Sequence, residues 1–189
     1  MSSGVSLSTG SPWLVAIDLQ TVFGDPISPW ATPDFARAAA GTRALRPAFA
    51  GRTVHTRFVA PTEPVGAWQA YYTDWPFARV SPDDPLYDLV AEVARGNDPV
   101  VSATTFGKWG PDLEAAIRPS RQIVLTGVST DCCVLSTALA AADAGVQVRV
   151  VTDACAGLTA ADHQRALDAM ALYAPLITLT TVAEVLASV

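Results

Sequence analysis

The sequence predicts an α/β fold in which one parallel β-sheet is covered by helices on both faces. Three observations carry this prediction. Short apolar runs of strand length recur along the chain, and stretches of helical composition separate them. Such alternation is typical of parallel sheets. No internal repeat or linker divides the 189 residues, which suffice for a single domain with a large core.

The expected elements follow in order. Apolar or β-branched runs predict six strands, at residues 12–17, 53–59, 99–102, 122–126, 146–151 and 176–180. Helix-like stretches lie at residues 33–50, 85–95, 111–117, 131–144, 160–172 and 182–189. Alanine and leucine dominate residues 135–144, and Gly145 stands where a helix end is expected.

Composition excludes several classes of partner. The net charge is −6, Lys108 is the single lysine, and the arginines are scattered. Without a basic cluster we expect no binding to nucleic acid or to an anionic membrane surface. No apolar run reaches the length of a membrane span.

The N-terminus and the cysteines predict a compartment. Residues 1–11 have neither the basic nor the apolar region of a secretory signal, and we expect a flexible leader. Three cysteines, two of them adjacent, cannot form a disulfide framework and indicate free thiols. The expected location is the cytoplasm.

Residues 60–85 interrupt the alternation of strands and helices. This stretch contains five prolines and the aromatic residues Trp68, Tyr71, Tyr72, Trp75 and Phe77. A long loop at the carboxyl end of a strand is where open α/β sheets bind ligands. A lid that merely seals the core is the alternative.

Chemically useful side chains follow four expected strands. Asp18 follows the first strand, Lys108 the third, Cys132 and Cys133 the fourth, and Asp153 with Cys155 the fifth. Since the carboxyl ends of parallel strands meet at one edge, a carboxylate, an amine and a thiol could share a pocket. Each residue also has a plain structural explanation, as a helix cap, a surface lysine or a small buried side chain.

These three groups suit a cysteine-dependent hydrolase. A free thiol is mostly protonated near neutral pH, so a catalyst must help to ionise it. A carboxylate can accept the thiol proton and return it to a leaving amine, while a lysine orients that carboxylate. Backbone N–H groups of Ser129 and Cys133 would form an oxyanion hole at the strand-to-helix turn.

Four segments resemble the isochorismatase-like cysteine hydrolases. They are Ile17-Asp-Leu-Gln20 with Phe23, Gly127-Val-Ser-Thr-Asp-Cys-Cys-Val134, Thr137-Ala-Leu139 and Val150-Val-Thr-Asp-Ala154. The resemblance implies a doubly wound, Rossmann-like sheet of six parallel strands, formed by residues 12–189. It further implies an Asp–Lys–Cys triad, a thioester intermediate, and assembly into a homodimer or tetramer.

The resemblance assigns roles residue by residue. Asp18 matches the family aspartate, and Cys133 matches the nucleophile because it directly precedes Val134. A cis peptide bond before Ser129 is also implied. The family lysine stands at the end of the third strand, whereas Lys108 comes about five residues later. Lys108 is the prediction, with Arg57 as the cation or an incomplete triad as alternatives.

Neither a metal nor another cofactor is expected. The family that the sequence resembles includes nicotinamidases, which carry a metal site with histidine ligands. In this sequence His55 and His163 are too far apart to form a ligand set. A serine hydrolase using Ser129, Asp153 and His163 is a competing reading, although Asp131 replaces the glycine of its turn motif. Vinyl-ether hydrolysis of the isochorismatase type and a non-catalytic binding or regulatory role remain open.

The predicted function is hydrolysis of a C–N bond in a small-molecule amide, lactam or ureide. Ring-bearing substrates are expected, with streptothricin-type lactams as one possibility. The residues expected to line the pocket are Phe23, Arg57, Trp68, Tyr72, Trp75 and Phe106.

Overall fold

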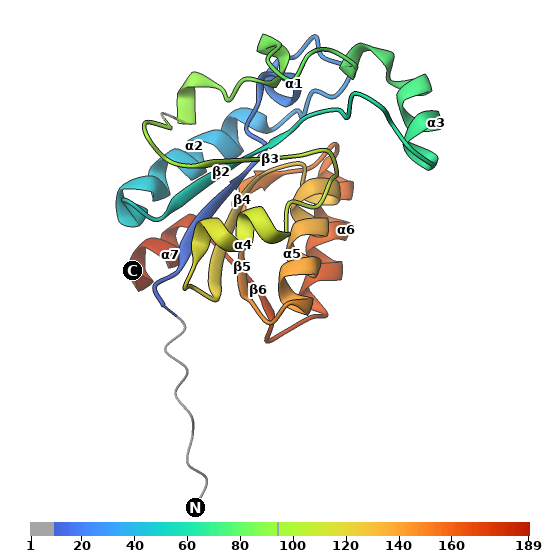
Figure 1. The fold of residues 1–189 in the computed structure, drawn as a ribbon. Helices are drawn as coiled ribbons and strands as arrows, with labels where there is room; N and C mark the ends of the chain where they lie inside the picture. The colour runs from blue at the N-terminus through green and yellow to red at the C-terminus, as the bar shows by residue number, and fades with distance from the viewer. Residues whose placement is uncertain (1–9, 94) are drawn as a thin grey trace, which may run out of the picture.

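Six parallel strands form one sheet at the centre of the molecule (Figure 1). The computed structural model describes residues 10–93 and 95–189, so most of the expected leader lies outside the described residues. The sheet order is β3-β2-β1-β4-β5-β6. The strands are β1 (Trp13–Ile17), β2 (Thr53–Phe58), β3 (Val100–Ala103), β4 (Gln122–Val128), β5 (Gln147–Ala156) and β6 (Ile177–Thr180).

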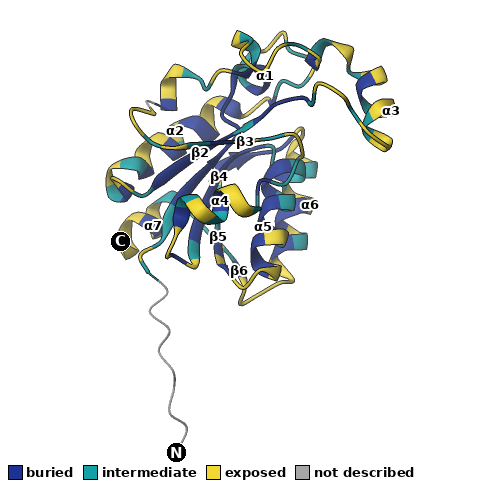
Figure 2. Cartoon of the chain, viewed as in Figure 1, coloured by how far each residue is buried: buried dark blue, intermediate teal, exposed yellow. Residues whose placement is uncertain are grey.

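Helices cover both faces of the sheet. On one face, α2 (Phe35–Leu45) and α7 (Val182–Ser188) pack against β4 and β5. On the other lie α4 (Pro111–Ile117), α5 (Leu135–Asp143) and α6 (Ala160–Ala171). Figure 2 shows the strands buried at the centre and the outer helix surfaces exposed. The predicted doubly wound α/β fold is therefore confirmed.

The strand order reverses beside β1. The chain runs outward through β2 and β3, then returns to place β4 on the other side of β1. Such a switch point leaves a crevice at the carboxyl ends of the strands, where the two connections diverge. The residues that follow β1 and β4 border this crevice.

Residues 85–95 do not form the expected helix. Only short 3₁₀ turns occur there, at Pro85–Tyr87 and Ala91–Val93, and residue 94 lies outside the described part of the chain. The backbone in between pairs with the segment that follows β1, since Thr21 N–H donates to Asp88 O (2.9 Å) and Val90 N–H donates to Leu19 O (2.9 Å). These long-range bonds hold the segment extended, which prevents a continuous helix.

Two short helices occur where none was expected. Helix α1 (Thr21–Gly24) follows β1 directly, and α3 (Ala67–Asp74) lies within the aromatic loop. Figure 1 shows α3 beyond one end of the sheet, on the side away from the chain termini. Both helices contribute aromatic side chains to the cluster above the crevice.

Candidate active site

Asp18 is held at the end of β1 by the neighbouring strand. Its φ is 49°, a left-handed conformation that is uncommon outside glycine. The Asp18 N–H donates to Thr56 Oγ1 (3.1 Å), and the Thr56 hydroxyl donates to Asp18 Oδ1 (2.6 Å). The side chain of Asp18 is fully buried. Strand β2 therefore fixes both the backbone and the carboxylate of this residue.

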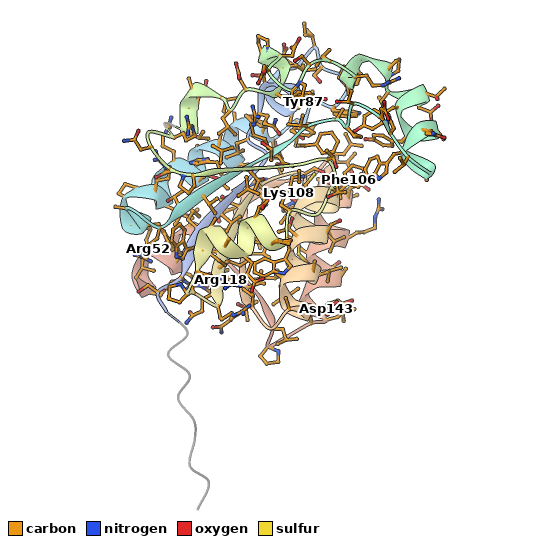
Figure 3. The ribbon with its side chains drawn as sticks, viewed as in Figure 1. Arg52, Tyr87, Phe106, Lys108, Arg118 and Asp143 are labelled. Carbon is orange, nitrogen blue, oxygen red and sulfur yellow. The ribbon has the colours of Figure 1, made fainter. Side chains whose placement is uncertain are left out.

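Lys108 reaches the Asp18 carboxylate from the loop that follows β3. Its Nζ lies 2.9 Å from Asp18 Oδ2, and neither side chain is exposed to solvent. The ammonium donates hydrogen bonds to the carbonyls of Thr105 (2.7 Å) and Phe106 (2.9 Å). These two hydrogen bonds and the ion pair with Asp18 hold the ammonium in place. Figure 3 labels Lys108 and Phe106 close together on this loop.

Thr137 ties the lysine loop to the turn that carries Cys133. The Lys108 backbone N–H donates to Thr137 Oγ1 (2.9 Å), and the Thr137 hydroxyl donates to the carbonyl of Cys133 (2.6 Å). One buried side chain on α5 thus fixes the distance between the loop and the turn. This link explains how a lysine displaced along the sequence still meets the aspartate.

Cys133 lies in a single wide turn between β4 and α5. In this turn the Val134 N–H donates to the carbonyl of Ser129, five residues earlier (3.0 Å). Wide turns of this kind occur frequently at functional sites. The Val128–Ser129 peptide bond is cis, as the resemblance implied. Cys133 itself is almost fully buried.

Burial first, and then the charges of Asp18 and Lys108, act on the pKa of the Cys133 thiol. Burial raises the pKa of Cys133 well above its ordinary value, and the negative charge of Asp18 raises it further. The positive charge of Lys108 lowers the same pKa but does not offset the other two effects. The thiol therefore lies beside a buried carboxylate and a buried ammonium, whose opposite charges act on its pKa in opposite directions.

A pocket opens above the thiol. Its volume is about 250 Å³, and Ser129, Asp131, Cys132 and Cys133 line its base. Aromatic rings form its walls, from Phe23, Trp30, Phe58, Tyr71, Trp75 and Phe106. A largely apolar cavity with a few convergent polar groups is typical of a small-molecule site.

The predicted lining residues are divided between this pocket and its surroundings. Phe23, Trp75 and Phe106 line the pocket. Trp68 packs behind it, with its ring centroid 5.1 Å from that of Phe106, and Tyr72 is buried 6.0 Å from Trp68. These two rings support the wall and do not form its inner surface.

The structure places Arg57 outside the pocket, contrary to the expectation. Its Nε donates to the Ser102 hydroxyl (3.2 Å), and the side chain borders a separate depression beside β3. The side chains of adjacent strand residues point to opposite sides of a sheet. Phe58, the next residue, faces the pocket in place of Arg57.

Eight residues that line the pocket were not among the predicted site residues: Pro29, Trp30, Thr32, Phe58, Tyr71, Asp131, Cys132 and Leu158. Tyr71 lies in the aromatic loop and could have been included on that ground. Trp30 comes from the segment between α1 and α2, and its ring contacts Phe23, Phe58, Tyr71 and Trp75. No sequence pattern marks that segment.

Two of the three residues of the serine-hydrolase alternative, His163 and Asp153, are hydrogen-bonded elsewhere. His163 Nδ1 is hydrogen-bonded to the Thr130 hydroxyl (2.8 Å), and Asp153 Oδ1 accepts the Val182 N–H (2.9 Å). No hydrogen bond joins these side chains to Ser129 among the described residues. The geometry does not form a serine triad.

Cys155 and His55 are buried outside the pocket. Cys155 is fully buried, and burial raises its pKa to about 12. His55 is buried beside Asp98, with 3.5 Å between Nε2 and Oδ2. Within residues 10–93 and 95–189, no group of three or more His, Cys, Asp or Glu side chains is placed to hold a metal ion.

A doubly wound sheet with a buried Asp–Lys pair beside a cysteine at a strand-to-helix turn defines a class of α/β hydrolase. The family model of the Isochorismatase domain matches residues 12–184. The chain belongs to this family of hydrolases.

Curated and solved relatives agree with this assignment. "Isochorismatase domain-containing protein 2" of Xenopus laevis is 37% identical over 88 residues, which span 45% of this chain and 43% of that protein. A cysteine hydrolase from Pseudomonas syringae pv. phaseolicola has a TM-score of 0.82 at 20% identity, covering 98% of this chain and 96% of its own. N-carbamoylsarcosine amidase from Thermoplasma acidophilum has a TM-score of 0.74 at 20% identity, and the match covers 92% of this chain and 97% of that protein. At these identities the two solved structures show the shared fold.

None of the described helices has both the length and the apolar character needed to cross a membrane.

Proposed function

We propose that the protein hydrolyses a C–N bond of a small-molecule amide, lactam or ureide through a thioester on Cys133. The observation that carries this proposal is the buried ion pair of Asp18 and Lys108 beside that thiol (2.9 Å between Nζ and Oδ2). The structural likeness to an enzyme named N-carbamoylsarcosine amidase is consistent with C–N chemistry on this fold.

In the first half-reaction the thiol proton moves from Cys133 to Asp18 as the sulfur attacks the substrate carbonyl carbon. The raised pKa of the buried thiol favours this concerted transfer over a standing thiolate. The carbonyl oxygen becomes an oxyanion, which the backbone N–H groups of Ser129 and Cys133 are proposed to stabilise. The C–N bond then breaks, and Asp18 returns the proton to the leaving nitrogen.

In the second half-reaction water replaces the amine. Asp18 accepts a proton from the water molecule while the water oxygen attacks the thioester carbonyl carbon. The C–S bond breaks, the acid product leaves, and the proton returns to the Cys133 sulfur. The same carboxylate acts as base and as acid in both halves.

Lys108 has a positioning role in this scheme. Its ammonium donates to two carbonyls of its own loop and forms an ion pair with the Asp18 carboxylate, with 2.9 Å between Nζ and Oδ2. The positive charge orients the carboxylate and moderates the rise in the pKa of Cys133. It lies behind the carboxylate and does not need to touch the substrate.

Trapping the acyl-enzyme tests the proposal. The purified protein is incubated with a panel of aryl amides, lactams and ureides, quenched in acid and analysed by intact and tandem mass spectrometry. We expect an acyl adduct on Cys133 and none in the Cys133→Ala variant, with Cys132→Ala as the matched control that retains it. An adduct on another residue, or turnover that survives in Cys133→Ala, would contradict the mechanism. Turnover of a vinyl ether by Cys133→Ala would favour the isochorismatase-type reaction.

A further inference from the structure

The pocket above Cys133 has an unusual charge balance. Among the described residues that line it, Asp131 is the single acidic side chain, and none is basic. The others are aromatic, aliphatic, hydroxyl or thiol groups. A substrate entering the cavity therefore meets one carboxylate and no cation on its walls.

Three basic side chains from segments around the pocket are engaged elsewhere. Lys108 is buried and paired with Asp18. Arg57 donates to the Ser102 hydroxyl and borders a separate depression. Arg37 donates to the backbone carbonyls of Asp153 (2.9 Å) and Cys155 (3.0 Å), and it is not among the residues that line the cavity. None of the three is placed to neutralise an anion bound in the pocket.

The aromatic walls add no positive charge to the pocket. Trp30 packs edge-to-face with Phe58 at 75° and with Trp75 at 62°, with ring centroids 5.6 Å and 6.1 Å apart. The faces of aromatic rings carry partial negative charge, which attracts cations and repels anions.

Asp131 is held at the base of the pocket by the loop after β5. Its Oδ1 accepts the N–H of Leu158 (3.1 Å), and Leu158 also lines the cavity. The approach of this loop is close, because a Cβ added at Gly157 would lie 2.8 Å from that same oxygen. The carboxylate therefore has a fixed position, and an asparagine could keep the bond to Leu158.

We infer that the pocket selects uncharged or cationic substrates and rejects those that carry a carboxylate, and that Asp131 sets this preference. The inference rests on the proposed function only in placing the substrate in this pocket. It names aromatic or alkylammonium-bearing amides as the substrate class. Amides bearing a free carboxylate are excluded, because the anion would lose its hydration without gaining a cationic partner.

A binding experiment tests the inference without turnover. The Cys133→Ala variant is titrated with benzyltrimethylammonium, with its uncharged isostere neopentylbenzene and with phenylacetate, using tryptophan fluorescence because Trp30 and Trp75 line the cavity. We expect phenylacetate to bind at least about tenfold more weakly than neopentylbenzene, and benzyltrimethylammonium at least as tightly as the neutral ligand. Phenylacetate binding within about threefold of the neutral ligand would overturn the inference.

Adding Asp131→Asn to the same variant isolates the carboxylate. The ratio of the dissociation constants of phenylacetate and neopentylbenzene should fall several-fold. The affinity of benzyltrimethylammonium relative to neopentylbenzene should fall in parallel. Asp74→Asn is the matched control, since it removes an exposed charge at the end of α3, outside the pocket lining. Affinity ratios among the three ligands that stay unchanged in Asp131→Asn would show that Asp131 does not set the preference.

Kinetics separate the two hypotheses. The wild-type protein is assayed with phenylacetamide analogues whose ring carries a trimethylammonium, a tert-butyl or a carboxylate group. Charge-selective binding without hydrolysis of any amide would overturn the proposed function and leave the inference standing. Hydrolysis in which the carboxylate analogue has the highest kcat/KM would overturn the inference and leave the proposed function standing.

Discussion

Replacing Lys108 by methionine leaves the carboxylate of Asp18 buried without its ionic partner. Methionine keeps most of the volume of the lysine stem and removes the charge. In the wild-type protein the two charges are 2.9 Å apart, and neither side chain is exposed to solvent. The variant retains the Thr56 hydroxyl bond to Asp18 Oδ1 (2.6 Å) as the main compensation for that charge.

The expected loss of stability is large. At an effective dielectric constant of about 20, two unit charges separated by 2.9 Å attract by about 6 kcal/mol. The cost of removing both charges from water offsets part of this attraction in the intact pair. Deleting one partner of such a pair typically costs about 3–5 kcal/mol, because the other charge stays buried. We expect Lys108→Met to lower the free energy of unfolding by this amount and to abolish activity.

Urea denaturation of three variants measures the effect. Asp18→Asn alone should cost a similar amount, whereas the double variant should lose only about 1–2 kcal/mol because no charge remains unpaired. Arg118→Met is the matched control. It removes a surface pair with Glu114 (3.5 Å) in which the arginine is 69% exposed, and it should change stability by less than about 0.5 kcal/mol.

The double-mutant cycle provides the refutation. If Lys108→Met costs less than about 1 kcal/mol, or if the two single losses simply add, the side chains do not form a buried, energetically coupled pair. The positioning role proposed for Lys108 would then lose its basis.

Three further predictions concern pH, thiol reactivity and backbone geometry. Burial lowers the pKa of His55 to about 4, whereas the same side chain in the unfolded chain takes up a proton below about pH 6.5. The free energy of unfolding should therefore fall by about 3 kcal/mol as the pH drops from 6.5 to 4. Urea midpoints measured across this pH range should show the fall, and His55→Leu should reduce it. Alkylation of Cys133 by iodoacetamide, located by tandem mass spectrometry, should be slow near neutral pH, because burial and then the Asp18 charge raise the pKa of the thiol. In Asp18→Asn the pH dependence of the alkylation rate should shift to lower pH. A wild-type rate that levels off below about pH 8 would contradict this. Gly127→Ala should lower the free energy of unfolding by more than about 3 kcal/mol or prevent folding, because a Cβ there would lie 2.0 Å from the Ile17 carbonyl oxygen at a φ of 108°. Gly51→Ala is the control: its φ is 72° and the space around it is open, so the loss should be about 1 kcal/mol. Equal melting temperatures of the two variants would refute the argument.

The strands were predictable because their signals are local. Apolar runs bounded by turn residues identified all six strands, with β5 extending further than expected, to Ala156. The alternation with helices then required a parallel sheet, whose carboxyl ends gather functional groups. This rule placed Asp18 and Cys133 at the same edge before any contact was known.

The segments that failed depend on long-range contacts. Residues 85–95 have a helical composition but are drawn into pairing with the chain after β1, as the bridge between Gln20 and Leu89 shows. The position of Trp30 is set by packing against rings from other elements. No local pattern contains such information.

The sequence by itself determined the fold class and the order of the strands along the chain, and it placed Asp18 and Cys133 after the first and the fourth of them. Only the tertiary structure decided whether Lys108 reaches the carboxylate, because that depends on the loop carbonyls and on Thr137, which hold it in place. The structure also placed Arg57 away from the pocket and left Asp131 as its charged lining residue. Spacing along the chain fixes which strand end a residue follows, but the direction and reach of its side chain depend on contacts with distant residues.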